Sequence, residues 1–265
     1  LKQLEYEEYQ EFQKSYFDRM FFEGAFYGGI SKEDTIKLWK QVSEIIDADV
    51  FPDYLSLSKT FSFPEDGNSY LIRQKTHRHG NALLLVLEAS DASLETGLIH
   101  KILSIILRSE FFETLRTKQQ TAYKLHNWHE VIQEKICHCF SLQSSTHSPL
   151  DLLHRVETFL TDFSHALKKV IHPDRWEIVR NGLILSKLTQ LQHIQKTEDL
   201  QLIYQKVEIL SSLTYDKFIQ AIEKTFCAEN RKRVGILVEG KASIPFESTE
   251  SSIPYLPIEK ERFYK

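Results

Sequence analysis

The segment Ala82–Ala89 reads A-L-L-L-V-L-E-A and contains the longest uninterrupted apolar run of the chain, the six residues from Ala82 to Leu87. A strand with one face in water would alternate apolar and polar residues, whereas both faces of this segment are apolar. The run therefore predicts a central strand that is covered on both faces. It is also far shorter than the roughly 18 residues that a membrane-spanning helix needs, so we expect no membrane span.

Strand and helix patterns alternate along the rest of the chain in an order that predicts an α+β fold. Strands are expected at 70–75, 121–128, 134–143 and 233–239, and a turn near His129 and Glu130 is expected to join the middle two. Helices are expected at 1–22, 31–46, 93–118 and 148–170, followed by three more from Pro173 onward. The proline-containing tail after residue 241 is expected to be extended over the surface.

Two stretches of the chain share a short pattern. Residues 6–28 and residues 215–240 each contain spaced aromatic residues on a helix, then a short apolar stretch and a glycine. We interpret residues 1–67 as the end of one structural repeat plus a linker, and residues 68–265 as a complete second copy. Pro52, Pro64 and the pair Asp66-Gly67 mark the linker.

Eleven histidines raise the question of zinc. A helical zinc peptidase site needs H-E-x-x-H or its inverted form H-x-x-E-H, and neither occurs. The nearest match, His126, His129 and Glu130, has a different spacing and lies in a hairpin pattern, so we interpret these as surface residues of a turn. His77 and His79 offer only two ligands. We therefore predict no metal and no cofactor in this segment.

Other catalytic signatures are missing as well. The sequence contains no G-x-S-x-G motif and no glycine-rich phosphate loop. The three cysteines are too few for a disulfide framework. Cys137 and Cys139 are two positions apart on an expected strand and thus share a face, which favours buried thiols over metal ligands.

The net charge of −4 gives no general attraction to nucleic acid. The basic clusters Arg73–His79 and Arg231–Arg233 are interpreted as solvated strand ends or loops. The N-terminal residues are charged and lack the apolar region of a signal peptide. We expect a soluble protein and favour the cytoplasm over the periplasm. Because the chain begins with Leu1, we interpret it as a fragment of a longer protein.

The most informative segment is Leu107–Tyr123, which reads L-R-S-E-F-F-E-T-L-R-T-K-Q-Q-T-A-Y. It resembles the insulinase/pitrilysin family of zinc metallopeptidases, whose C-terminal half carries a helix ending in a phrase close to F-x-x-L-R-T-K-E-Q-L-G-Y. The matching residues are Phe112, Leu115, Arg116, Thr117, Lys118, Gln120 and Tyr123. Weaker similarity in 9–32 and 155–160 extends the resemblance over nearly the whole chain. Gln119 and Thr121-Ala122 depart from the phrase.

The resemblance implies the metallopeptidase-repeat fold, a mostly antiparallel sheet with helices on one face. In this family the Arg and Tyr of the phrase reach substrate carbonyls near the scissile bond, which makes Arg116 and Tyr123 the candidate substrate-binding residues. A guanidinium and a phenol are suitable hydrogen-bond donors for that role. The alternative is that Arg116 caps its helix and Tyr123 is a half-buried strand aromatic.

The resemblance also implies a division of labour. Zinc is expected in an H-x-x-E-H site of the N-terminal half of the same protein, and the present segment is expected to enclose unfolded peptide substrates without catalysing their cleavage alone. The alternative function is a non-catalytic peptide-binding or scaffold module of the same fold. An intact H-x-x-E-H in the N-terminal half would decide between the two.

Overall fold

The computed structural model describes residues 5–17, 19–20, 22, 24–26, 28–46, 49–50, 63–64, 66–191, 197–227, 229–241 and 253–258. Contacts within the chain divide it into two compact units, Leu1–Lys59 and Thr60–Lys265. The interpretation of residues 1–67 as the end of a preceding repeat stays a prediction. Most of the expected linker, from Pro52 to Gly67, lies outside the described residues.

The first unit contains the helices α1 (Tyr6–Phe17) and α2 (Lys32–Ile46) and the parallel strands β1 (Arg19–Met20) and β2 (Asp49–Val50). Ser31 begins α2 as predicted, because its Oγ accepts a hydrogen bond from the backbone N–H of Asp34 at 3.1 Å. The predicted apolar stripe of α2 is only partly covered. Ile36 and Ile45 on this stripe are 48% and 82% exposed.

The second unit contains a six-stranded sheet in the order β5-β6-β4-β7-β3-β8. Its strands are β3 (Ser69–His79), β4 (Asn81–Asp91), β5 (Lys124–Ile132), β6 (Lys135–Ser144), β7 (Arg233–Lys241) and β8 (Tyr255–Pro257). The pairs β5–β6, β6–β4 and β4–β7 are antiparallel, and β3 runs parallel to both β7 and β8. The sheet is therefore mostly antiparallel, with the apolar strand β4 inside it, as the sequence predicts.

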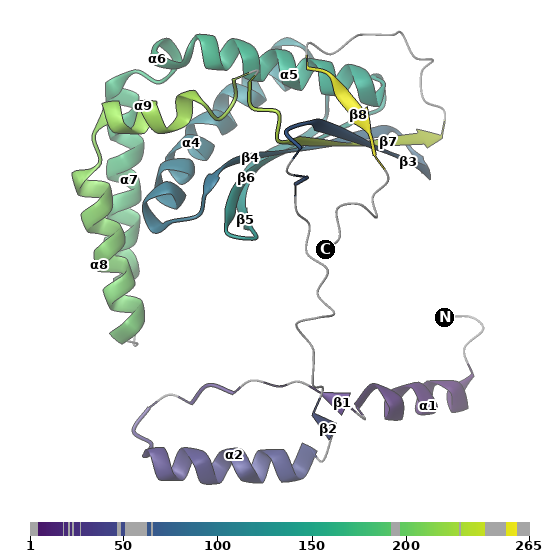
Figure 1. Ribbon diagram of the computed structural model, residues 1–265, viewed down its shortest axis with the longest axis vertical. Coiled ribbons are helices and arrows are strands. Elements are labelled where there is room, and N and C mark those ends of the chain that lie inside the picture. The colour runs from purple at the N-terminus through teal and green to yellow at the C-terminus, as the bar shows by residue number, and fades with distance from the viewer. Residues whose placement is uncertain are drawn as a thin grey trace. The chain divides into compact units, whose positions relative to one another are not determined.

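Helices cover one face of this sheet (Figure 1). They are α4 (Leu94–Phe112), α5 (Pro149–His165), α6 (Leu167–Val170), α7 (Pro173–Leu191), α8 (Thr197–Ser212) and α9 (Tyr215–Glu223). Leu83, Leu85 and Leu87 of β4 enter the core under the helices. On the opposite face Val86 packs against Cys137 and Cys139. The prediction that both thiols are buried on one face is confirmed.

The predicted position of the hairpin turn is wrong. β5 continues through His129 and Glu130, and the turn lies at Gln133 and Glu134. Both turn residues have positive φ, 47° and 58°, in the region that glycine and asparagine usually occupy. Without either residue type, the sequence carries no visible signal for this turn.

The apolar spacing in 93–118 predicts that Ile105 and Phe112 are buried together with Leu98, Ile102 and Ile106, but these two lie at the surface. Ile105 and Phe112 are 38% and 43% exposed, whereas Leu98, Ile102 and Ile106 are buried as predicted. The long helix buries only the side that faces the sheet and the neighbouring helices. Phe112 instead forms part of an open pocket that is described below.

The basic cluster at Arg231–Arg233 is not wholly solvated. Arg233 is 1% exposed and forms an ion pair with Glu157, which is equally buried. The hydroxyl of Tyr255 donates a hydrogen bond to the same carboxylate. Residues 255–257 of the tail are extended, as expected, but they pair with β3 and add an edge strand to the sheet.

Within the described residues, no helix combines the length and the apolar character that crossing a membrane requires.

Candidate functional site

The motif that resembles the peptidases lies where α4 ends. The helix widens there into the π-helix η1 (Glu113–Lys118). The backbone N–H of Gln119 donates to the carbonyl of Thr114 at 3.0 Å, five residues back. Leu115, which is fully buried, holds this widened turn against the core. Single π-turns inside helices are frequent at functional sites.

Arg116 and Tyr123, the two predicted substrate-binding residues, lie on the same pocket. Its volume is about 410 Å³ and its lining residues are Arg108, Phe112, Arg116, Tyr123, Lys124, Leu125, His126 and Asn127. The structure thus joins the end of α4 and η1 to the beginning of β5. No motif in the sequence indicated a role for Arg108, Lys124 or Asn127. Arg108 stands two helical turns before Arg116, a spacing that could have suggested it.

Arg116 is exposed, and its guanidinium lies 5.0 Å from the centroid of the Phe112 ring. This cation–π contact orients the side chain along the helix. Among the described residues Arg116 has no hydrogen bond to a carbonyl of its own helix, although its charge in the last turn of η1 is favourable for the helix dipole. Its donors are therefore available to a ligand.

The backbone of Tyr123 is held by a hydrogen bond, and its side chain is exposed. Its N–H donates to the carbonyl of Gln143 at 3.2 Å, which ties it to the neighbouring strand β6. Tyr123 is 58% exposed. This is more exposed than the alternative interpretation, a half-buried strand aromatic, would predict. The hydroxyl has only a long contact, 3.5 Å, to Oε1 of Gln143. The hydroxyl can give up this weak contact and donate to a better acceptor at little cost in free energy.

Asn127 lies in the same lining but is almost completely buried. Its Nδ2 donates to the carbonyl of Ser104 on α4 at 3.3 Å. Its Oδ1 is buried without a hydrogen-bond partner among the described residues. An unpaired buried acceptor typically costs about 1–3 kcal/mol of free energy.

Behind the pocket, a cluster of histidines joins α4 to the β5–β6 hairpin. Nδ1 of His129 lies 2.9 Å from Oγ of Ser104, and Nδ1 of His100 lies 2.8 Å from Nε2 of His138. Burial lowers the pKa of His100 to about 4 and that of His138 well below its usual range. These rings are neutral near pH 7, so they hold the hairpin on the helix without adding charge.

The arrangement of His126 and His129 differs from the predicted surface turn. Both lie on β5, where an odd separation places them on opposite faces. Only His126 is in the lining of the pocket. In the described part of the chain, no group of three or more His, Cys, Asp or Glu side chains is arranged to hold a metal ion.

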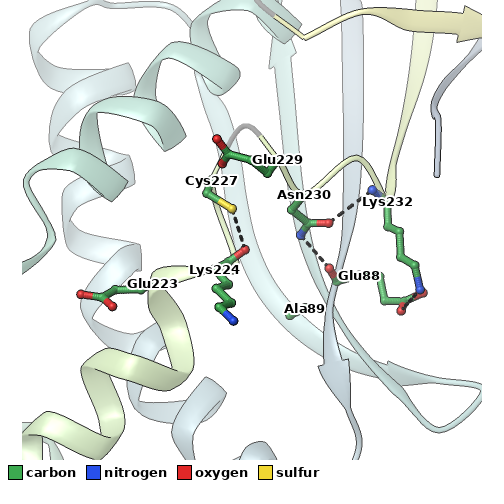
Figure 2. Close-up of a pocket in the computed structure, with 8 residues that line it drawn as sticks. All are labelled: Glu88, Ala89, Glu223, Lys224, Cys227, Glu229, Asn230 and Lys232. Atoms are coloured by element: carbon green, nitrogen blue, oxygen red, sulfur yellow. Dashed lines mark hydrogen bonds and ion pairs between the residues drawn. The ribbon is translucent and has the colours of Figure 1, made fainter.

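A second pocket, of about 650 Å³, lies between β4 and the segment that follows α9 (Figure 2). Several of its polar groups have partners within the protein. Nζ of Lys232 lies 2.7 Å from a carboxylate oxygen of Glu88, and Sγ of Cys227 donates to the carbonyl of Lys224 at 3.1 Å. Asn230 donates to the carbonyl of Glu88 at 2.9 Å. This pocket is held together by its own bonds and offers a ligand less than the first pocket does.

Comparisons with known proteins agree with the motif. The family model described as "PQQ synthase PqqF-like, C-terminal lobe domain 4" matches residues 102–200. A nardilysin-like protein of Arabidopsis thaliana is 23% identical over 174 residues, which are 63% of this chain and 17% of that protein. The crystal structure of pitrilysin superposes with a TM-score of 0.60 at 17% identity, covering 88% of this chain and 26% of pitrilysin.

These matches make the chain similar to the C-terminal half of insulinase-type (M16) peptidases. A structure titled as a peptidase M16 inactive domain, from Pseudomonas fluorescens, has the same fold. It superposes with a TM-score of 0.53 at 15% identity over 82% of this chain and 53% of that structure. The chain spans about a sixth of the nardilysin-like protein and about a quarter of pitrilysin.

Proposed function

We propose that this M16 domain holds peptide substrates for a zinc peptidase whose catalytic residues lie in the N-terminal half of the same protein. The single observation that carries the proposal is the shared pocket of Arg116 and Tyr123. Both residues come from the motif that resembles the family. Both present exposed donors to one hollow, Arg116 from η1 and Tyr123 from the bend before β5.

The hydrogen-bonding groups of this pocket complement a peptide backbone. The Arg116 guanidinium and the Tyr123 hydroxyl can donate to carbonyl oxygens. Two donors in one lining suit the carbonyl groups of a main chain. The Oδ1 of Asn127 is buried and does not reach the hollow in this structure.

The rigid surroundings favour the same role. β6 fixes the backbone of Tyr123, while the widened turn η1 and the ring of Phe112 fix Arg116. A donor that is already in place loses little entropy when a carbonyl develops negative charge. In the proposed enzyme, zinc in the N-terminal half supplies the activated water for peptide hydrolysis. The present domain contributes orientation and hydrogen bonds.

The experiment is cleavage of a fluorogenic peptide by the full-length protein carrying Arg116→Ala or Tyr123→Phe. Loss of a donor that acts on the transition state typically costs roughly 3 kcal/mol, so we expect kcat/KM to fall about a hundredfold. The matched control is Tyr204→Phe, because Tyr204 is 60% exposed on α8 and lies outside the pocket lining. Unchanged cleavage by both pocket variants, with melting temperatures equal to wild type, would overturn the proposal.

A further inference from the structure

The pocket that contains Arg116 has an unbalanced charge. Three of its lining residues are Arg108, Arg116 and Lys124, and His126 adds a fourth basic group. None of the lining residues is Asp or Glu. Among the described residues, neither arginine nor Lys124 forms an ion pair with a carboxylate.

The nearest acidic residues on the helix have other cationic partners. Glu110 pairs with Arg175 at 2.7 Å, and Glu113 is 3.9 Å from Lys118. Neither belongs to the lining of the pocket. The positive charge that faces the hollow is therefore not neutralised from within the domain.

The four basic groups converge from two elements. Arg108, Phe112 and Arg116 follow one another at four-residue intervals, which places them along one side of the helix. Lys124 and His126 are two positions apart on β5 and share a face. The Lys124 ammonium lies 6.0 Å from the centroid of the Tyr123 ring. Like charges brought together in a concave site favour an anionic ligand by their summed field.

We infer that this pocket selects peptides by binding a carboxylate, either that of an Asp or Glu side chain or that of the peptide C-terminus. The inference rests on the proposed function, since it takes a peptide as the occupant. Arg108 would pair with the carboxylate, because a guanidinium can donate two parallel hydrogen bonds to one carboxylate. Arg116 and Tyr123 remain the donors to the main chain. The volume of about 410 Å³ has room for a side chain and its flanking backbone.

The test compares fluorescein-labelled nonapeptides that differ at a single position, Glu or Gln, and that end in either a free carboxylate or an amide. Their affinities for the 265-residue chain are measured by fluorescence anisotropy at low salt. We expect one carboxylate to tighten binding about fivefold, the upper end for a single bidentate ion pair that is partly exposed. A difference in affinity between the Glu and Gln peptides assigns the carboxylate to the side chain. A difference between the free and amidated peptides assigns it to the C-terminus. The advantage should shrink as salt is added.

Arg108→Gln should abolish the advantage of the acidic peptide and leave the affinity of the uncharged peptide, Gln with an amidated end, within twofold of wild type. Arg73→Gln is the matched control. Arg73 is an exposed arginine of β3, which lies four strands away from β5 in the sheet, and this variant should keep the full advantage.

The two hypotheses fail in different ways. If the chain binds acidic and uncharged peptides equally, the carboxylate preference is wrong while the peptide-holding function stands. If Arg108→Gln and Arg73→Gln reduce the advantage alike, the pocket is not its source and the inference is likewise overturned. If no peptide of the set binds even at millimolar concentration, both the inference and the proposed function are contradicted.

Discussion

Nδ1 of His100 lies 2.8 Å from Nε2 of His138, and the two rings are buried where α4 crosses β6. The contact works only if one ring donates and the other accepts, so at least one of them must be unprotonated. Oγ of Ser90 lies 3.3 Å from Nε2 of His100 and continues the chain of contacts. Nearby, Lys101 adds positive charge that lowers the pKa of His129 further, after burial.

The first prediction is acid sensitivity of the fold. The folded-state pKa of His100 is lowered to about 4 from an ordinary value of 6.5, so its contribution is present above pH 6.5 and is lost as the pH falls toward 4. For this ring alone the free energy of unfolding should fall by about 2 kcal/mol between pH 7 and pH 5. Urea denaturation at a series of pH values measures it.

The control separates this titration from general destabilisation. His100→Asn should reduce the pH dependence between pH 7 and pH 5, whatever it does to stability at pH 7, and leave the part that His138 and His129 contribute. His126→Gln, at an exposed position on β5, should keep the wild-type dependence. Equal slopes for wild type and His100→Asn would mean that this ring is not the acid-sensitive group.

The second prediction concerns the buried pair of Arg233 and Glu157. Glu157→Gln leaves the Arg233 cation buried without a counter-charge, which should lower the free energy of unfolding by about 3–5 kcal/mol. Tyr255→Phe removes only the hydroxyl that donates to Glu157 and should cost about 1–2 kcal/mol. Tyr204→Phe on α8 is the control, with no change expected. A Glu157→Gln variant as stable as wild type would show that the pair contributes nothing.

The third prediction distinguishes the three thiols. Burial raises the pKa of both Cys137 and Cys139 to about 12, while Cys227 is partly exposed. At pH 8 one thiol should react quickly with Ellman's reagent and the other two only in denaturant. Cys227→Ser should remove the fast phase. Rapid reaction of two or three thiols in the folded chain would contradict the buried face of the sheet.

The fourth prediction uses two glycines in different surroundings. A Cβ on Gly240 would lie 2.1 Å from the carbonyl oxygen of Gly80, so Gly240→Ala must displace backbone and should lower the melting temperature markedly. A Cβ on Gly97, inside α4, meets no atom within 4 Å. Gly97→Ala should therefore stabilise the chain by about 0.5–1 kcal/mol. Similar effects of the two changes in thermal melts would refute this packing.

The features that could be predicted from the sequence are those that local chemistry determines. The apolar run at Ala82–Leu87 became the inner strand β4. Ser31, Ser93 and Ser148 cap the helices that they were expected to begin, and Pro149 occupies the first turn of α5. Each signal depends on a few neighbouring residues, and no distant contact overrides it.

The features that were missed depend on contacts between distant residues. His100 and His138 are 38 positions apart, and only the crossing of α4 over β6 brings them together. Arg233 looked like part of a solvated basic cluster because its partner Glu157 is 76 positions away. The same holds for the candidate site. Arg116 and Tyr123 came from a motif, whereas the charge of their pocket also needs Arg108 and Lys124 from two elements.

The most direct measurement of the central claim is site-directed photocrosslinking. The full-length protein is prepared with p-benzoylphenylalanine in place of Tyr123 and, separately, in place of Tyr204, and each is irradiated with a biotinylated peptide substrate. A peptide held in the pocket of Arg116 should crosslink efficiently at position 123 and hardly at position 204, and excess unlabelled peptide should abolish the signal. Absence of a crosslink at 123, or equal crosslinking at both positions, would contradict the account.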